Sequence, residues 1–242
     1  MNVFGLIGHP LTHSFSKEYF DKKFDHEKIT DAQFKLFDLE KIELVQDLIL
    51  DESIKGLAIT IPYKQQILPF LFSKNENVIQ SKACNCLKIL DGKLFGFNTD
   101  IIGFEKSFIK QLQPFHQKAL VLGNGGAAAA ITFILRALQI DYSCVTRINE
   151  SDCFTYDELN EKIINNHQII INTTPLGTFP FVETYPNIPY QFLTSQHYLF
   201  DVVYNPTETI LMKKGLAQKA IVKNGYEMLC IQAEENWKIW NV

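Results

Sequence analysis

The 242-residue sequence lacks the patterns that mark several protein classes. It has no block rich in Lys and Arg, and its formal net charge of −4 and pI near 5.9 give no electrostatic footprint for nucleic acid or an anionic membrane. No apolar run reaches the ~18 residues that a membrane span needs. The segment Met1–Leu6 also lacks the basic start of a secretory signal. We therefore expect a cytoplasmic protein with no nucleic-acid or membrane partner.

Paired cysteines are also lacking. The five cysteines are an odd number, and none forms a C-x-x-C pair. Cys84 and Cys86 could begin a metal site, but no Cys/His cluster follows at a useful distance, so we expect reduced thiols and no metal. What is present, 46% hydrophobic and 21% charged residues, is ordinary for a soluble globular chain of one large or two small domains.

The first hundred residues alternate between strand and helix patterns, which favours an α/β fold with a parallel sheet. Ser16 precedes a helical pattern and is a plausible N-cap. The other expected elements are the strand Val3–Gly8, the strand Gln33–Phe37, the helix Ile42–Leu50 and the strand Ile54–Ile61, which Pro62 stops.

Polar residues follow two of these strands. In an open parallel sheet, ligands gather beyond the carboxyl ends of the strands, and Ser14, Ser16, Thr60 and Lys64 all fall there. A lone lysine is usually a solvated surface cation. The position of Lys64 beyond a strand end makes a ligand contact the sharper hypothesis.

A helical stretch to about Ser81 leads to a hairpin, which Asp91-Gly92 predicts as a two-residue turn. Its pairing would bring Asn85 beside Asn98–Asp100. Asp100 stands at the start of a helical pattern. Either Asp100 or Thr99 is simply the N-cap of that helix, or Asp100 is a carboxylate that faces a ligand at a junction between two domains. Several hydrogen-bonding groups with one cation suit a small ligand that carries hydroxyls and a carboxylate.

The second half opens with an apolar strand, Lys118–Leu122, a glycine-rich turn, Gly123–Ala130, and a helix through Leu138. Amide groups at such a turn, with the positive end of the helix, can hold a pyrophosphate. Another strand, Tyr142–Thr146, begins about twenty residues on. This context favours a dinucleotide fold over a tight turn that needs small residues only for packing.

Arg147 follows that strand, where an acidic side chain would favour NAD and an arginine favours a 2′-phosphate. NADP is therefore preferred, although Glu150 is nearby and no second basic residue stands in 148–153. Later strands are expected at Gln168–Asn172 and Leu199–Tyr204.

The last segment, Asn224–Trp240, has helical spacing and closes the core. Gln232 could reach the ligand if this helix returns to the first domain.

Together these stretches resemble the shikimate dehydrogenase family, in family order from residue 5 to residue 232. Each motif alone is weak, but the ordered set is highly specific. The matching stretches are Gly5–Pro10 with His13–Ser16, Thr60–Lys64, Asn98–Asp100 with Gly103-Phe104, Gly123–Ala127, Asn172–Gly177 and Asp201–Pro206.

The resemblance implies a substrate-binding α/β domain of residues 1–100 plus 226–242, and a Rossmann-like NADP-binding domain of residues 101–225. It implies NADPH-dependent reduction of 3-dehydroshikimate to shikimate, a step of chorismate and aromatic amino-acid biosynthesis, by a monomer or homodimer.

The resemblance also assigns roles to single residues. Ser14 and Ser16 would hold the substrate carboxylate. Around the rest of the substrate would lie Thr60, Lys64, Asn85, Asp100, Gln232 and Tyr204. The cofactor would contact Gly123, Asn124, Gly125, Gly126 and Ala127 at its pyrophosphate, Arg147 at its 2′-phosphate, Val202 and Gly225 near its nicotinamide, and also Thr174.

We expect Lys64 to be the acid–base group or its electrostatic core. Asp100 would bond both to Lys64 and to the same substrate hydroxyl, so that the pair acts as one coupled unit. Two departures from the family pattern are Lys82–Cys86, for Gly-Ala-x-Asn-Thr, and Thr146–Ile148, for Asn-Arg-Thr. The alternatives are an NAD-linked quinate/shikimate dehydrogenase and a non-catalytic sensor of the ligand. Ser16, rather than threonine, favours shikimate, and retention of Lys64 with Asp100 favours an enzyme.

Overall fold

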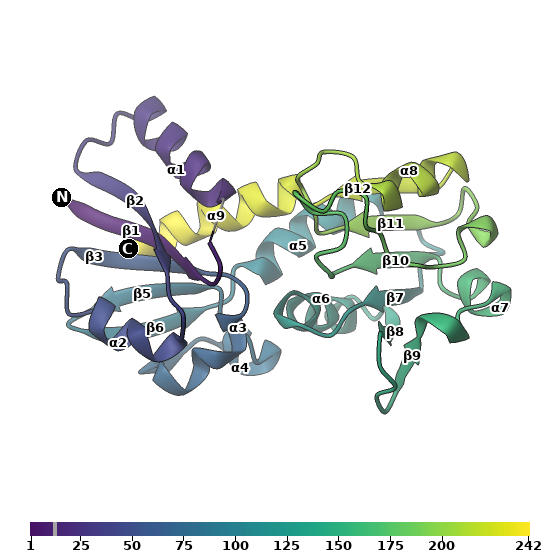
Figure 1. Cartoon of the computed structure of the whole chain (residues 1–242), viewed down its shortest axis with the longest axis horizontal. Coiled ribbons are helices and arrows are strands. Elements are labelled where there is room, and N and C mark those ends of the chain that lie inside the picture. Colours follow the sequence, from purple (N-terminus) through teal and green to yellow (C-terminus); the bar gives the residue numbers. More distant parts are fainter. Residues whose placement is uncertain (12–13) are drawn as a thin grey trace. The chain divides into compact units, whose positions relative to one another are not determined.

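The structure is a computed structural model, and it describes residues 1–11 and 14–242. His13, part of one motif above, lies outside the described residues. The chain forms two compact units, Met1–Ile102 with Cys230–Val242, and Gly103–Leu229. It passes from the first to the second within α5 (Asp100–Phe108) and returns within α9 (Tyr226–Trp240), as Figure 1 shows. The C-terminal part of α9 therefore belongs to the first unit.

The first unit holds a six-stranded sheet in the order β2-β1-β3-β5-β6-β4. Its strands are β1 (Asn2–Gly8), β2 (Ala32–Asp38), β3 (Ile54–Ile59), β4 (Ser73–Lys74), β5 (Cys86–Leu90) and β6 (Lys93–Phe97). The expected parallel pairing holds for β1 with β2 and with β3. The sheet becomes mixed at β5, which is antiparallel to both β3 and β6. The hairpin turn is as predicted, with Asp91 and Gly92 at φ of 50° and 67°.

Side chains that alternate along β1 build a core on each face of this sheet. Phe4 and Leu6 pack with Phe20 of α1 (Phe15–His26) and with Trp240 of α9. On the other face, Ile7 belongs to the core that contains residues of the short helices α2 (Val45–Leu48), α3 (Tyr63–Gln66) and α4 (Glu76–Ser81). The sheet is covered on both sides, which leaves its strand ends as the place for polar groups.

Three local predictions were wrong in detail. Ser14, not Ser16, is the N-cap of α1, because its Oγ accepts a hydrogen bond from the backbone N of Lys17 at 3.3 Å. The predicted helix Ile42–Leu50 is a 3₁₀ turn, Ile42–Leu44, followed only by α2. The predicted helix up to Ser81 is interrupted by a 3₁₀ turn, Leu68–Phe70, which contains a proline, and by β4.

The second unit holds a sheet in the order β12-β11-β10-β7-β8-β9, and all of its neighbouring strands are parallel. Its strands are β7 (Lys118–Leu122), β8 (Asp141–Thr146), β9 (Cys153–Thr155), β10 (Ile169–Asn172), β11 (Tyr198–Asp201) and β12 (Ile221–Asn224). The edge strands β9 and β12 were not predicted, and β11 ends at Asp201, three residues before its predicted end at Tyr204.

Helices and 3₁₀ turns complete this unit: α6 (Gly126–Ala137), α7 (Glu161–Asn165), α8 (Ile210–Ala217), Ile109–Gln111, Tyr156–Glu158 and Tyr190–Phe192. Phe104 and Phe108 of α5 pack against Phe200, and Phe108 also stacks on Tyr198. On the opposite face, Leu120 and Leu199 share a core with residues of α7 and α8. The arrangement is an open parallel sheet with helices on both faces.

None of the five cysteines forms a disulfide, and Cys144 of β8 lies opposite Cys153 of β9. Across the described ranges, 1–11 and 14–242, no helix is both long and apolar enough to cross a bilayer.

Candidate functional site

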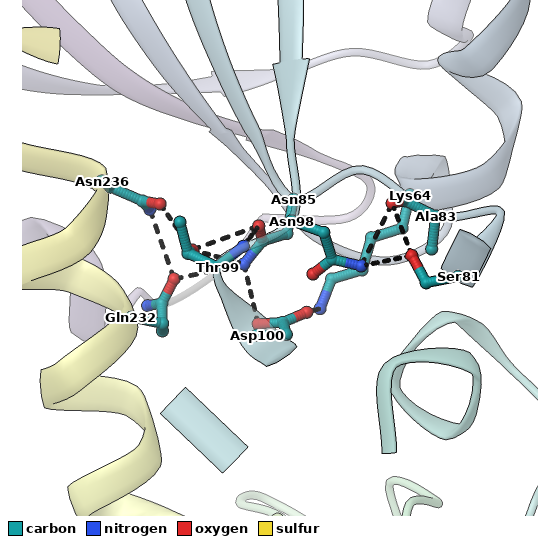
Figure 2. A network of polar contacts seen from close by, with 9 residues as sticks. All are labelled: Lys64, Ser81, Ala83, Asn85, Asn98, Thr99, Asp100, Gln232 and Asn236. Carbon is teal, nitrogen blue, oxygen red and sulfur yellow. Dashed lines mark hydrogen bonds and ion pairs between the residues drawn. The ribbon is translucent and has the colours of Figure 1, made fainter. Parts of the chain in front are cut away.

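An ion pair between Lys64 and Asp100 is the centre of the polar cluster in the first unit (Figure 2). Lys64 belongs to α3, just after β3, and Asp100 is the first residue of α5, just after β6. The Lys64 Nζ lies 2.6 Å from Asp100 Oδ2, and the side chains are only 18% and 8% exposed. The sequence placed both residues beyond strand ends, and the structure brings them into direct contact.

Asn85 holds the other side of the same carboxylate. Its Nδ2 donates to Asp100 Oδ1 at 2.8 Å, while its Oδ1 accepts from the backbone N of Thr99 at 2.7 Å. The backbone of Asn85 bonds to Ile59 of β3 and Phe97 of β6. The amide is therefore anchored to the sheet on both sides, which fixes the direction in which Asp100 faces.

The helix α9 completes the cluster with two amides four residues apart. Gln232 Oε1 lies 3.4 Å from Asn85 Nδ2 and accepts from Asn236 Nδ2 at 3.2 Å. Asn236 Oδ1 accepts from the Thr99 hydroxyl at 2.6 Å. The return of α9 to the first unit thus places Gln232 beside Asn85. This return is the condition under which we expected Gln232 to reach the ligand.

Asn236, Thr99 and Asn98 also belong to this cluster, although none of them was predicted to contact the substrate. Asn236 had one detectable signal, because it stands at i+4 from Gln232 and so shares a helix face with it. Asn98 is held by different partners. Its Nδ2 donates to Ser81 Oγ and to the Ala83 carbonyl, and its Oδ1 is buried without a partner. It therefore joins the end of α4 to the short segment between β6 and α5, next to Asp100.

The other residues predicted to contact the substrate lie outside this cluster. Ser14 caps α1, and Ser16 is half-buried in its first turn. Thr60 directly follows β3, and its backbone N donates to Ile7. Among the described residues, no side-chain hydrogen bond joins these three hydroxyls to Lys64 or Asp100. Tyr204 belongs to the second unit, where burial raises the pKa of its hydroxyl.

The second unit carries a glycine-rich turn between β7 and α6. Gly123 has φ of +103°, and a Cβ there would lie 2.8 Å from Thr173 Oγ1, so the position requires glycine. Gly125 is the N-cap of the twelve-residue α6 and has open space around its missing Cβ. Gly126 and Ala127 begin the helix. This turn presents free amide groups and room for an anion at a helix N-terminus, so it fits a pyrophosphate.

A buried network positions the loops beyond β10 and β11. Asn172 Oδ1 accepts from the hydroxyl and the backbone N of Thr174, and its Nδ2 donates to Asp201 Oδ1 at 2.9 Å. Asp201 also accepts from the Thr209 hydroxyl and from the backbone N of Val203. Burial raises the pKa of this carboxyl to about 6.

Val202 and Gly225, both predicted to lie near a nicotinamide, are in contact. A Cβ at Gly225 would lie 2.1 Å from the Val202 carbonyl oxygen, closer than any side chain allows. The backbone N of Gly225 also donates to the Val203 carbonyl at 3.1 Å. Glycine therefore lets the end of β12 pass directly against the loop that follows β11.

Arg147 is exposed on the loop after β8, at the end of the strand next to β7. Glu150 lies on the same loop, and both of its carboxylate oxygens accept from Asn124 Nδ2, at 3.0 and 2.8 Å. The glycine-rich turn and the loop that carries Arg147 are thus joined by side chains.

In residues 1–11 and 14–242, no group of three His, Cys, Asp or Glu side chains could hold a metal ion. The chemical groups present are an ammonium paired with a carboxylate in one unit and, in the other, a glycine-rich turn at a helix N-terminus beyond a strand of a parallel sheet. This combination defines a dinucleotide-dependent oxidoreductase of the two-domain α/β class.

Known proteins narrow this class. Residues 6–87 match the family model for the shikimate dehydrogenase substrate binding domain. The NADP(+)-dependent shikimate dehydrogenase of Ignicoccus hospitalis is 36% identical over 98% of this chain and 92% of its own, and that of Clostridium beijerinckii is 35% identical over the same shares. The chain belongs to the shikimate dehydrogenase family.

A solved structure agrees with this assignment. The chorismate mutase/shikimate 5-dehydrogenase fusion protein from Clostridium acetobutylicum matches with a TM-score of 0.87 and 31% identity, over all of this chain and 91% of that one. The predicted fold class is therefore confirmed.

Proposed function

We propose that the protein reduces 3-dehydroshikimate to shikimate with NADPH, as a step of chorismate and aromatic amino-acid biosynthesis. The single observation that carries this proposal for the chain itself is the contact between Lys64 Nζ and Asp100 Oδ2 inside an ordered amide cluster. Membership of a family whose relatives are named NADP(+)-dependent shikimate dehydrogenases supports the same reaction.

The substrate-binding role is assigned to the first unit. Ser14 and Ser16 offer hydroxyls for the substrate carboxylate, and Thr60, Asn85 and Gln232 offer donors and acceptors for its ring hydroxyls. Tyr204 of the second unit is proposed to line the substrate side. A carbocyclic acid with several hydroxyls needs this many directed groups, because each unmatched hydroxyl would lose its hydrogen bonds to water on binding.

The chemical step needs a proton at the ketone oxygen while the ketone carbon accepts a hydride. When bound, NADPH supplies that hydride. Lys64 has three protons and directs one of them to Asp100, which leaves the ammonium able to donate a second to the oxygen. Asp100, fixed by Asn85, keeps the ammonium in place and accepts from the adjacent substrate hydroxyl. Afterwards the neutral amine regains its proton from water.

The cofactor role is assigned to the second unit. The turn Gly123–Ala127, with Asn124, would hold the pyrophosphate, and Arg147 the 2′-phosphate. Thr174, Val202 and Gly225 stand on the loops that would meet the nicotinamide half. The open space around Gly125 and the twelve-residue helix behind it support this assignment.

The free thiols support a reducing, cytoplasmic location. The proposed assembly is a monomer or a homodimer. Sedimentation equilibrium would measure the oligomeric state.

The function is tested by the decay of NADPH absorbance with 3-dehydroshikimate as substrate, and by repeating the assay with NADH and with quinate or shikimate in the reverse direction. We expect turnover with 3-dehydroshikimate and faster turnover with NADPH than with NADH. Tight binding of shikimate without any NADPH oxidation would instead identify a ligand sensor.

A further inference from the structure

The contact between Asn124 and Glu150 bears on cofactor choice. Asn124 belongs to the glycine-rich turn and Glu150 to the loop after β8, three residues beyond Arg147. Both Glu150 oxygens accept from one amide nitrogen, at 3.0 and 2.8 Å, so the carboxylate is held toward the turn rather than extended into water. In the described part of the chain, no ion pair joins Arg147 to Glu150.

In a parallel sheet of this kind, the adenosine ribose lies beyond the strand that follows the glycine-rich helix, which here is β8. A carboxylate at this place accepts from ribose hydroxyls, whereas an arginine pairs with a 2′-phosphate. This loop carries one of each charge. A 2′-phosphate, with a charge of about −1.5 to −2 near pH 7, would meet an attractive Arg147 and a repulsive Glu150 together.

We propose that Glu150, positioned by Asn124, is a specificity-determining residue that weakens the preference of this site for a 2′-phosphate and lets the ribose hydroxyls of NAD bind as well. The proposal rests on the proposed function, because it takes the Gly123–Ala127 turn to be the pyrophosphate site. Its physical content is a single negative charge on the same loop as Arg147, which would hold the phosphate, so the repulsion should weaken as salt screens it.

The test uses two ligands without a nicotinamide ring, 2′-phospho-ADP-ribose and ADP-ribose, and measures their dissociation constants by calorimetry on the full chain. Replacement of Glu150 by Gln removes the charge but keeps an acceptor for Asn124. We expect E150Q to bind 2′-phospho-ADP-ribose about tenfold more tightly and ADP-ribose several-fold more weakly, as expected from the loss of one nearby charge. The effect on the phosphorylated ligand should shrink in high salt.

Asp141→Asn is the matched control, since it makes the same charge change at the amino end of β8. Asp141 stands six residues before Arg147, roughly 20 Å away at ~3.3 Å per residue, and D141N should change neither constant. Asn124→Ala tests the positioning role. This variant should weaken the binding of both ligands. It should lower the ratio of the dissociation constant of 2′-phospho-ADP-ribose to that of ADP-ribose by less than E150Q does.

Equal shifts for the two ligands in E150Q, or no shift in either, would overturn the proposal, as would an absence of binding by both. The unfolding midpoint of each variant shows that it is folded. The outcomes also separate this proposal from the proposed function. If the variants change nucleotide binding as expected but the protein does not oxidise NADPH with 3-dehydroshikimate, the role of Glu150 stands and only the proposed reaction fails.

Discussion

Lys64 and Asp100 are 36 residues apart in sequence, yet the Lys64 ammonium lies 2.6 Å from the Asp100 carboxylate. Each stands on the first turn of a helix that follows a strand of the same sheet. The hydrogen bond from Asn85 to the other Asp100 oxygen holds the carboxylate from the opposite side. The two charged groups therefore form a preorganised pair whose members can be tested one at a time.

Replacement of Lys64 by Ala should lower kcat by about 100-fold or more while changing KM less, because the ammonium is proposed to act on the reacting oxygen in the transition state. Lys64→Arg is the informative companion: it keeps a cation opposite Asp100 but cannot release a proton at neutral pH. Steady-state kinetics with NADPH and 3-dehydroshikimate measures both. If the arginine variant retains the full kcat, Lys64 acts as a fixed charge and not as a proton donor.

Two glycines of the second unit should respond in opposite ways to the same added methyl group. Gly125→Ala places a Cβ in open space, so the midpoint of thermal unfolding should stay nearly constant while nucleotide affinity falls at least several-fold. Gly225→Ala places a Cβ 2.1 Å from a backbone oxygen and should lower the midpoint, since the backbone must move. Calorimetric titration with ADP-ribose and a thermal melt of each variant decide this. A Gly125 variant that binds as tightly as the parent would remove this turn from the pyrophosphate site.

Local sequence signals were sufficient for features that are themselves local. The dipeptide Asp91-Gly92 predicted the hairpin, and the glycines before α6 predicted the strand-to-helix turn. The convergence of strand ends placed Lys64 near other polar residues, whereas its pairing with Asp100 was expected only from the family resemblance and the mechanism that it implies. The N-cap of α1 was predicted at Ser16 but is Ser14, because the start of the helix depends on the backbone conformation at a single residue.

Contacts that depend on the packing of distant segments left no comparable signal. The Thr99 hydroxyl meets Asn236 across 137 residues, and Asn124 meets Glu150 across 26. The short edge strand β9 pairs with β8 through only three residue pairs, too few to show a periodic pattern. These contacts form only when segments that are distant in sequence pack together in the folded chain.

The buried carboxyl of Asp201 should make the stability of the second unit depend on pH. Its folded pKa of about 6 is above the ordinary value of 3.8, so the fold favours the neutral form. The free energy of unfolding should therefore fall as pH rises from about 4 to about 6, by up to ~3 kcal/mol. Asp201→Asn, which can still accept from Asn172 and Val203, should lose this dependence.

Urea unfolding of the parent and of Asp201→Asn at several pH values gives the comparison. The buried histidines, whose pKa values are lowered by desolvation, act in the opposite sense, because the fold favours their neutral form and loses stability as pH falls. They are present in both proteins, so the difference between the two curves isolates Asp201. A difference that does not change between pH 4 and pH 7 would contradict the expected titration.

Trp240 should be the residue through which α9 stabilises the first unit. Its ring stacks on Phe4 at 5.2 Å, its Nε1 donates to the Leu87 carbonyl at 2.9 Å, and a Cβ on Gly56 would lie 2.2 Å from the ring. Trp240→Ala should cost ~3–5 kcal/mol of unfolding free energy through the cavity it leaves. Trp240→Phe keeps most of the ring but leaves the carbonyl without its donor, at a cost of about 1–3 kcal/mol. Denaturant unfolding should rank the two variants in this order, while ADP-ribose, which is assigned to the second unit, should bind both as it binds the parent. An alanine variant as stable as the parent would show that the last turn of α9 does not hold the first unit together, and Gln232 and Asn236 would then need another anchor.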